Sequence, residues 1–326
     1  MEIIASTINA GELLSNEASR TCIQPAVSVV ITLYNYSAFI GGCLESVRAS
    51  RTEGLPGGFE VVVVDDASTD TSAKIVEEYM AVHALPICLV KKPVNSGLAD
   101  TRNSGLHTAR APLVFILDAD NEIRPDCLLK HYQAMVSSGC ALTYGFINRF
   151  DHATRQSLGT MSHHEWNVRE LVSRPCIDAM AMIRKEPVLQ LGGYSPEYGP
   201  MLPQGWEDYD LWLKLAQAGH AGKLIPQILS DYRVHPQCMI HQTNAFRREL
   251  ALYFLRKFHK LAQQYPDTTQ LFDFSRRELQ VISRQSPRAP IQPKSKSQQL
   301  VHGILGRKIC RSFCKRLAAA YGWMYP

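Results

Sequence analysis

Carboxylate side chains gather in this sequence directly after short apolar runs. Asp65 and Asp66 end one such run, and Asp118 and Asp120 end another. Carboxylates brought together repel one another unless a cation or a set of hydrogen-bond donors compensates their charge. Two aspartates at positions i and i+2 of a strand-to-loop turn can supply hard oxygen ligands and leave room for phosphate groups, as Mg²⁺ prefers. The spacing therefore predicts a divalent-metal site that also admits a phosphate-bearing ligand.

A second acidic pair, Glu207 and Asp208, lies at the start of a predicted helix that extends from Glu207 to Ala218. The dipole of a helix stabilises carboxylates at its N-terminus, so a structural role is the ordinary interpretation of such a pair. The same reasoning makes Asp70 and Ser68 turn and helix-capping residues. A positioned carboxylate can also accept a proton from a hydroxyl group, and neighbouring motifs have to decide between the two roles.

The acids can meet only if the apolar runs before them are strands of one sheet. Three runs rich in β-branched residues, at 27–31, 59–64 and 113–117, are short and almost wholly apolar, which is typical of parallel strands covered on both faces. Helical periodicity follows the second and third runs, at 73–83 and 125–136. This alternation predicts an α/β fold, a three-layer α/β/α sandwich with a mostly parallel central sheet. In such sheets the ligand crevice lies beyond the carboxyl ends of the strands.

The second half of the chain has a more mixed pattern. Residues 140–146, 176–183 and 227–234 are predicted strands, and 246–261 is a longer amphipathic helix. The predicted parts of the chain are a leader at 1–25 that packs late or not at all, a main domain at 26–240 with halves at 26–120 and 121–240, a helical extension at 241–283, a linker at 284–299 and a basic amphipathic helix at 300–326.

Composition places the chain among ordinary globular proteins. Its 326 residues are 45% hydrophobic and 20% charged, which excludes a disordered, collagen-like or coiled-coil chain. The apolar runs are far shorter than the roughly 20 residues that span a bilayer, and the first residues do not have the pattern of a signal peptide, so we expect a cytoplasmic protein. The net charge of +5 arises from the segment from Arg284 to Pro326, where nine Lys or Arg occur without an acid. The main domain offers no basic stripe, so no nucleic-acid partner is expected.

Six motifs occur in order along the main domain. They are Val27-Ser28-Val29-Val30-Ile31-Thr32-Leu33-Tyr34-Asn35, Val64-Asp65-Asp66-Ala67-Ser68-Thr69-Asp70, Asn95-Ser96-Gly97 through Arg102-Asn103-Ser104-Gly105, Leu117-Asp118-Ala119-Asp120, Trp206-Glu207-Asp208-Tyr209-Asp210-Leu211-Trp212-Leu213 and Tyr232-Arg233-Val234-His235. Together they resemble the family 2 inverting glycosyltransferases of the GT-A fold. Any one motif is weak, but six in order with plausible spacing are strong. The resemblance covers about residues 26–240.

The resemblance implies a reaction and assigns roles to residues. It implies transfer of one sugar from a nucleotide diphosphate sugar, with a UDP-sugar favoured, to an acceptor hydroxyl. The implied catalytic base is Asp208, with Glu207 as its neighbour. The implied metal is Mn²⁺ or Mg²⁺, bound by Asp120 together with Asp118 and His235. The implied nucleotide-binding residues are Thr32, Tyr34, Asn35, Asp66, Arg102 and Asp118.

The chemistry requires these residue types independently of any family. A nucleoside diphosphate departs with growing negative charge on its oxygen, and a metal acting as a Lewis acid stabilises that charge. The acceptor hydroxyl is a poor nucleophile, and a carboxylate on the opposite face of the sugar accepts its proton, which typically contributes about 10²–10⁴ in rate. One carboxylate and one in-line attack give inversion at the anomeric carbon.

The sequence departs from the family pattern at several points. Thr32 stands where many relatives have Pro, and Ala67 where Gly is common. The Q-x-x-R-W segment of processive synthases does not occur in the sequence, so a single-addition transferase is expected. The resemblance makes 26–120 the nucleotide-binding half and 121–240 the acceptor-binding half. The acceptor stays open between a saccharide, a lipid-linked molecule and a protein.

Two other functions and the role of the basic tail also stay open. A sugar nucleotidyltransferase shares a related sheet but begins with a Gly-rich loop that carries Arg and Lys, and residues 32–42 contain neither. A catalytically inactive domain that binds glycans or serves as a scaffold is the non-enzymatic alternative, against which Asp66, Asp120 and Asp208 argue. The helix at 300–326 either contacts the inner face of an anionic membrane as a peripheral anchor or packs on its own domain.

Overall fold

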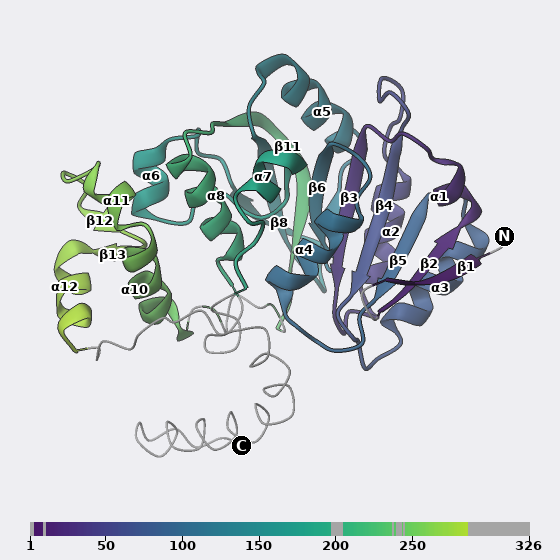
Figure 1. Ribbon diagram of the computed structural model, residues 1–326, viewed down its shortest axis with the longest axis horizontal. Coiled ribbons are helices and arrows are strands. Elements are labelled where there is room, and N and C mark those ends of the chain that lie inside the picture. Colours follow the sequence, from purple (N-terminus) through teal and green to yellow (C-terminus); the bar gives the residue numbers. More distant parts are fainter. Residues whose placement is uncertain are drawn as a thin grey trace. The chain divides into compact units, whose positions relative to one another are not determined.

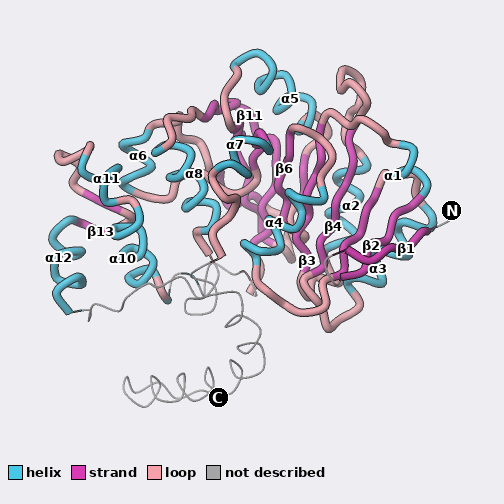
Figure 2. The backbone as a smooth tube through the Cα atoms, in the orientation of Figure 1, coloured by secondary structure: helices cyan, strands magenta, loops and turns pink. Residues whose placement is uncertain are grey.

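A computed structural model of the protein describes residues 3–8, 11–196, 205–236, 238, 243 and 245–285. Its centre is a mixed sheet with helices on both faces (Figures 1 and 2). The strands of this sheet are β1 (Ile3–Ile8), β2 (Gly11–Asn16), β3 (Val27–Leu33), β4 (Phe59–Asp65), β5 (Ile87–Lys91), β6 (Leu113–Asp118), β7 (Glu122–Ile123), β8 (Leu142–Asp151), β9 (Ser157–Met161), β10 (Ala181–Arg184) and β11 (Gly222–Val234). They lie in the order β1-β2-β5-β4-β3-β6-β10-β8-β11-β7, and β9 pairs with β8.

Helices connect these strands and form a C-terminal extension with a small hairpin. The helices are α1 (Glu17–Thr21), α2 (Ile40–Arg48), α3 (Ser72–Val82), α4 (Leu98–Thr108), α5 (Cys127–Ser138), α6 (Val168–Ser173), α7 (Lys185–Gln190), α8 (Glu207–Gln217), α10 (Arg247–Lys257), α11 (His259–Gln263) and α12 (Arg276–Gln285). The hairpin consists of β12 (Gln270–Leu271) and β13 (Phe274–Ser275).

Alternate residues of the central strands face two separate hydrophobic cores. Val30 of β3 and Val62 of β4 belong to the core that also contains residues of α4, α8 and α10. Val29 and Val61 of the same strands belong to the core formed with α2, α3 and α5. Every residue of β3 and β4 is buried, which is why both strands are nearly continuous runs of apolar residues. The predicted three-layer sandwich is confirmed.

The direction of the strands brings the acids to one edge of the sheet. The central strands β5, β4, β3 and β6 are parallel, whereas β2 and β10 join them in antiparallel pairing. The register places Thr32 of β3 level with Asp118 of β6, and Leu33 level with Asp65 of β4. The residues that follow these strands therefore emerge side by side.

Helix α4 lies close to the sheet because Gly105 has no side chain. A Cβ atom at this position would lie 2.3 Å from Cγ1 of Val30 in β3. Asn103 fixes the outer face of the same helix, since its amide group donates to the carbonyl oxygen of Tyr194 and accepts from the Tyr194 N–H, both at 2.8 Å. The helix carries Arg102 beneath the carboxyl ends of the central strands.

The N-terminal segment differs from the leader that we expected at 1–25. Strand β2 pairs with β5, and β1 pairs with β2, so this segment extends the sheet. Buried Asn16 explains the attachment. Its Nδ2 donates to the carbonyl oxygen of Leu85 at 2.8 Å, and its Oδ1 accepts from the N–H groups of Ser19 at 2.9 Å and Ile87 at 3.2 Å. These bonds act together with Leu14 of β2, which is buried in one of the two cores.

The C-terminal extension joins the main core. The helix expected at 246–261 is two helices, α10 and α11, with Phe258 between them. The rings of Phe254 and Phe258 are 5.9 Å apart, and Phe254 lies 5.1 Å from the ring of Tyr209 in α8. The extension therefore packs on α8. Residues 286–326, which include most of the predicted linker and the whole predicted basic helix, lie outside the described residues.

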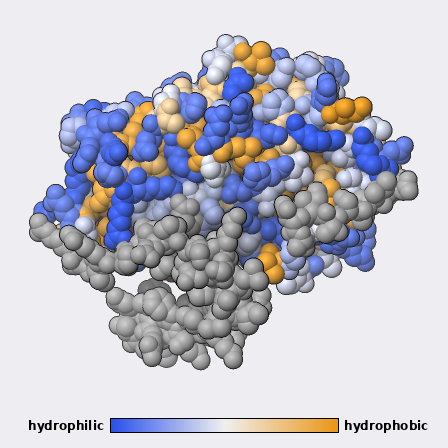
Figure 3. All heavy atoms as spheres, viewed as in Figure 1, coloured by the Kyte–Doolittle hydropathy of each residue, from blue (hydrophilic) through white to orange (hydrophobic). Residues whose placement is uncertain are grey.

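The described surface has large hydrophobic side chains in different elements. Examples are Ile23, Val82, Val136 and Val281. On the face shown in Figure 3, hydrophobic residues lie in small groups among hydrophilic ones, which is ordinary for a globular protein. Among the described helices, none is long and apolar enough to cross a membrane.

Candidate active site

Arg102 is the centre of the site. Its Nη2 donates to Oδ1 of Asp118 at 2.9 Å, and its Nη1 donates to Oε1 of Glu207. The same Asp118 oxygen accepts from Oγ1 of Thr32 at 2.9 Å. The Arg102 side chain is 1% exposed, and its guanidinium carbon lies 5.4 Å from the centre of the Tyr194 ring. This buried arginine therefore links the end of β6 to the start of α8, which are distant in sequence.

Helix α8 begins at a strained point of the backbone. Trp206 has a φ of 62°, a left-handed conformation that bulky residues rarely adopt. It directly precedes Glu207, which is buried, and Asp208, which is half-buried and accepts from the N–H of Tyr209 at 2.7 Å. Both carboxylates lie in the first turn, where the helix dipole favours negative charge. The strain fixes the direction in which the acidic pair leaves the preceding loop.

The other side of α8 is anchored by a buried ion pair. Asp210, which is fully buried, lies 2.7 Å from Nζ of Lys257 in α10 through its Oδ1. Its Oδ2 accepts from Oγ of Ser195 at 2.5 Å. The extension thus supports the helix turn that carries Asp208, two residues before Asp210.

Asp208 lies among other acids. Burial, the charge of Glu207 and the charge of Asp178 raise the pKa of Asp208 well above its ordinary value, while Arg102 acts in the opposite direction. Burial likewise raises the pKa of Asp178 to about 6. A carboxylate with a raised pKa accepts a proton more readily near neutral pH than an ordinary aspartate does. The arrangement can therefore perform general-base chemistry.

Asp120 and His235 form a second contact at the same edge. Nε2 of His235 lies 3.0 Å from Oδ2 of Asp120, and within the described structure its buried Nδ1 has no hydrogen-bond partner. Burial raises the pKa of Asp120, as does the charge of Asp118. Burial, then Asp120 and Asp118, also raise the pKa of Tyr36. Both aspartates of the Asp118-Ala119-Asp120 motif therefore belong to one site.

This pair suits a divalent cation. Two ligand atoms at about 2.1 Å from an ion, in neighbouring octahedral positions, are about 3 Å apart. That is the spacing between the Asp120 and His235 atoms. No group of three or more His, Cys, Asp or Glu among the described residues forms a complete metal site. Phosphate oxygens and water would have to supply the other ligands, as is usual for Mg²⁺.

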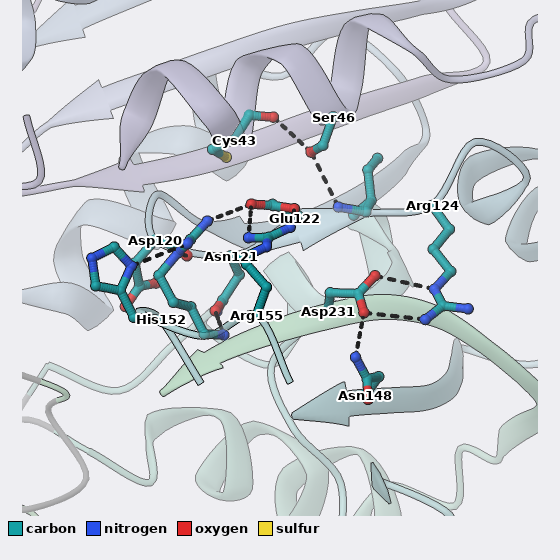
Figure 4. Close-up of polar contacts among 12 residues, drawn as sticks. Cys43, Ser46, Asp120, Asn121, Glu122, Arg124, Asn148, His152, Arg155 and Asp231 are labelled. Atoms are coloured by element: carbon teal, nitrogen blue, oxygen red, sulfur yellow. Dashed lines mark hydrogen bonds and ion pairs between the residues drawn. The ribbon is translucent and has the colours of Figure 1, made fainter. Parts of the chain in front are cut away.

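Figure 4 shows how the turn of Asp120 is held beside the end of β11. Nε of Arg233 donates to the Asp120 carbonyl oxygen at 2.8 Å, and the Arg233 N–H donates to Oδ1 of Asn121 at 2.9 Å. Glu122 forms ion pairs with Arg233 and, at 2.9 Å, with Arg155. These contacts fix the backbone of the turn and do not use the carboxylate of Asp120.

Two of the predicted nucleotide-binding residues lie at the ends of β3 and β4. Tyr34 is 43% exposed, so its ring can lie against a base. Asp66 is buried, and its carboxylate accepts from the N–H groups of Ser96 at 3.0 Å and Gly97 at 2.9 Å, with Nζ of Lys92 2.7 Å away. Oγ of Ser96 also donates to Oδ1 of Asp66, at 3.4 Å, whereas Oδ2 accepts only from Gly97 among the described residues. A carboxylate oxygen has about two acceptor positions, so Oδ2 can accept one more N–H from a ligand.

Asn35 uses its side-chain oxygen within the protein. Its Oδ1 accepts from the N–H groups of Thr69 at 2.8 Å and Asp70 at 3.3 Å. The carboxylate of Asp70 in turn accepts from the N–H groups of Ser37 at 3.1 Å and Ser72 at 2.9 Å. Asp70 is thus a turn residue, and the contact of Asn35 with a nucleotide stays a prediction.

Several residues of the site have little or no sequence signal. Tyr36 directly follows the motif that ends in Asn35, and Arg233 lies inside the motif that ends in His235. Asp178 lies in a segment without a motif or a regular spacing. Only the folded chain brings it to the acids of α8.

The family model described as "Glycosyl transferase family 2" matches residues 28–192, half of the chain. The chain belongs to glycosyl transferase family 2. The matched region contains β3, β4 and β6 with the acidic residues that follow them. The protein is therefore a glycosyltransferase.

Bacterial glycosyltransferases are among the relatives of this family 2 enzyme. It is 26% identical over 236 residues to the amylovoran biosynthesis glycosyltransferase AmsE of Erwinia amylovora, across 70% of this chain and 85% of AmsE. It is 31% identical over 221 residues to the putative teichuronic acid biosynthesis glycosyltransferase TuaG of Bacillus subtilis, across 65% of this chain and 80% of TuaG. Identity of 35% to a teichoic acid poly(glycerol phosphate) polymerase of Staphylococcus epidermidis extends over 97 residues, 30% of this chain and 13% of that longer protein.

Solved structures share the fold of this family 2 enzyme. S. aureus TarS 1–349, in complex with UDP-GlcNAc, has a TM-score of 0.54 at 19% identity, over 70% of this chain and 66% of that chain. The mannosyltransferase PcManGT of Pyrobaculum calidifontis, in complex with GDP-Man and Mn²⁺, has a TM-score of 0.54 at 20% identity, over 80% and 69%. The likeness confirms the predicted GT-A type sandwich.

Proposed function

We propose that this glycosyltransferase transfers a single sugar from a nucleotide diphosphate sugar, preferably a UDP-sugar, to an acceptor hydroxyl with inversion. The observation that carries the proposal is the Arg102 bridge between Asp118 and Glu207, which brings the acidic pair of α8 to the end of β6. Inversion by direct displacement needs a leaving-group site and a base on opposite sides of one sugar. The complexes of TarS with UDP-GlcNAc and of PcManGT with GDP-Man support a nucleotide-sugar donor.

In this proposal the ends of β3 and β4 bind the nucleoside. The exposed ring of Tyr34 lies against the base, and the acceptor position that remains on Asp66 takes an N–H such as that of uracil N3. The contact between Thr32 and Asp118 places the Asp118 carboxylate for a ribose hydroxyl. The N–H groups of Ser96 and Gly97 keep the Asp66 carboxylate in one orientation. Its preference for a ligand N–H therefore does not depend on a conformational change on binding.

At the leaving-group side, Asp120 and His235 would hold Mn²⁺ or Mg²⁺, with Asp118 beside them. When bound, the cation supplies Lewis-acid stabilisation of the departing diphosphate. Arg233 holds the backbone of the Asp120 turn, which keeps the carboxylate and the His235 ring 3.0 Å apart. Burial and the charge of Asp118 raise the pKa of Asp120, and the contact with His235 acts in the opposite direction without cancelling the rise.

On the acceptor side, Asp208 accepts the proton of the attacking hydroxyl. Arg102 compensates the charge of Glu207, which would otherwise add fully to the repulsion on an ionised Asp208. The half-buried position lets the Asp208 carboxylate reach a ligand while keeping most water away. A single general base of this kind fits the inverting reaction.

Replacing Asp120 with Ala tests the leaving-group site. We expect UDP to bind the wild-type protein at least about tenfold more tightly with Mn²⁺ than without it, and the variant to lose this metal-dependent part. Isothermal titration with and without Mn²⁺ measures both. Asp126→Ala, at an exposed aspartate paired with Arg51, is the matched control and should keep the metal effect. Equal UDP affinity of the wild-type protein with and without Mn²⁺ would contradict the proposed metal site.

The basic segment at 300–326 provides a separate prediction. We propose that it contacts anionic membrane, because its basic residues surround an apolar repeat. In the full chain, changing Arg307, Lys308, Arg311, Lys315 and Arg316 to Gln should lower the partition coefficient onto phosphatidylglycerol vesicles by roughly 10³-fold in co-sedimentation, since each basic residue near such a surface contributes roughly 1 kcal/mol. Vesicles of phosphatidylcholine alone are the control. Equal sedimentation of both proteins with anionic vesicles would exclude membrane contact through these residues.

A further inference from the structure

Asp178 is a carboxylate of the site that has no role in the mechanism above. It lies in the loop between α6 and β10, and the loop is fixed around it. Its N–H donates to Oγ of Ser162 at 2.8 Å, and its Oδ1 accepts from the N–H of Met180 at 3.0 Å. Ser162 is itself buried, with a left-handed φ of 56°. No hydrogen bond reaches Oδ2 of Asp178 within the described parts of the chain, so one oxygen of a rigidly held carboxylate is available.

Contacts of its own loop place Asp178 between the two sides of the proposed reaction. Nε1 of Trp212 in α8 donates to the carbonyl oxygen of Ile177, directly before Asp178, at 3.1 Å, and the strand that follows, β10, pairs antiparallel with β6, which ends at Asp118. Burial raises the pKa of Asp178, the charges of Asp118 and Glu207 add to the rise, and Arg102 in α4 acts in the opposite direction. The charge of Asp178 in turn raises the pKa of Asp208. The charge of Asp178 therefore interacts with residues of the leaving-group side and with the proposed base. An in-line displacement requires the transferred sugar to lie between exactly these two sides.

The chemistry of the available atoms indicates what binds there. Arg102 bonds directly to two carboxylates, and Asp178 is not one of them. A phosphate group would be repelled by the carboxylates of Asp118, Glu207 and Asp178. A neutral hydroxyl group can donate to the free oxygen of Asp178 without this repulsion, so a hydroxyl group fits the position.

We propose that Asp178 is a specificity-determining residue whose free oxygen accepts hydrogen bonds from hydroxyl groups of the transferred sugar. The inference rests on the proposed function, because it needs a nucleotide-sugar donor in the site. It also implies discrimination by charge, since a carboxylate at this position disfavours a uronic acid in the donor.

Asp178→Asn is the direct test. The amide keeps an acceptor for the N–H of Met180 but removes the negative charge from the free position. With the neutral UDP-sugar that the wild-type protein hydrolyses fastest in the absence of acceptor, we expect kcat/KM to fall roughly 10- to 100-fold, the range for losing a hydrogen bond to a charged group. The Kd of UDP, measured by titration, should stay within about twofold. Asp178→Ser should behave in the same way, and serves if the Asn variant does not fold.

Two further measurements separate sugar recognition from a structural role. The ratio of kcat/KM for UDP-glucose to that for UDP-glucuronate should fall in Asp178→Asn, because the repulsion is removed. A deoxy donor that lacks the bound hydroxyl should lose activity with the wild-type protein but not with the variant. Unchanged donor kinetics, an equal loss of UDP affinity, or a change confined to the KM of the acceptor would each overturn the assignment. If the wild-type protein bound no nucleotide at all, the proposed function would fail instead.

Discussion

Asp208→Asn is expected to lower the rate of sugar transfer by about 10²–10⁴ while leaving the affinity for UDP nearly unchanged. The substitution keeps the size of the side chain but removes the group that takes the proton from the acceptor hydroxyl. Nucleotide binding should persist, because Tyr34 and Asp66 lie at the ends of β3 and β4 and, in the part of the chain that the structure describes, do not bond to α8. UDP release in the presence of acceptor measures turnover, and titration measures UDP affinity.

A matched control for this variant is Glu170→Gln. Glu170 is also an acid in the first turn of a helix, but its partner is Arg174, which directly follows the last residue of that helix, and not Arg102. If the role of Asp208 were only to stabilise a helix N-terminus, the two variants would have similar, small effects on turnover. Unchanged turnover in Asp208→Asn would remove the base assignment.

The stability of the same variant gives a second readout. The pKa of Asp208 is raised in the folded protein by burial and by the neighbouring acids Glu207 and Asp178. The folded state therefore holds this proton more tightly than the unfolded chain, and stability falls as the pH rises from the unfolded pKa of about 3.9 through the folded pKa. The neutral Asn avoids this loss. The melting temperature of Asp208→Asn should thus equal that of the wild-type protein near pH 4 and exceed it at pH 8.

The central strands of the sheet are predictable from the sequence because almost all of their residues have the same role, which is to fill the hydrophobic cores. The runs at 27–31, 59–64 and 113–117 are buried on both faces, so their sequence contains little besides apolar, mostly β-branched residues. Their parallel order then places Thr32 beside Asp118 without further information. The departure from the family pattern at position 67 also has a structural consequence. Ala67 has a φ of 59°, a conformation for which Gly is better suited.

The edges of the sheet are not predictable in this way. Strands β1 and β2 belong to the fold through pairing and through the buried amide of Asn16, whose partner Leu85 is 69 positions away. A hydrogen bond between distant residues leaves no periodic signal. The break at Phe258 between α10 and α11 is similar, because the aromatic packing on α8, and not the local sequence, decides where the helix ends.

The candidate site also has features that the sequence predicts and features that it does not. Motifs identify Arg102, Asp118 and Glu207 one by one, but nothing in the sequence says that the arginine bonds to both acids, 16 and 105 positions away. Asp178 has no motif, and its place beside Asp208 depends on the loop before β10. Motifs in the sequence therefore identify single residues of the site. The contacts that balance the charges of these residues are visible only in the folded chain.

Replacing Arg102 with Met is expected to have the largest effect on stability. The methionine fills part of the same volume but leaves Asp118 and Glu207 without their cation, in a position where the arginine was 1% exposed. Breaking a buried ion pair by removing one partner typically costs about 3–5 kcal/mol. Urea unfolding at pH 8 measures this loss. Arg124→Met is the matched control, since Arg124 is 43% exposed in its ion pair with Asp231 and should lose no more than about 1 kcal/mol.

The pH dependence of the Arg102→Met variant distinguishes lost charge from lost packing. Without the guanidinium, the two carboxylates become harder to ionise, so the folded variant takes up protons and its deficit relative to the wild-type protein should shrink as the pH falls from 8 to 5.5. Adding Glu207→Gln removes one of the uncompensated charges and should recover part of the loss at pH 8. A deficit that is the same at both pH values, and is not relieved by Glu207→Gln, would mean that Arg102 acts through its packing against Tyr194 and not through the charges that it joins.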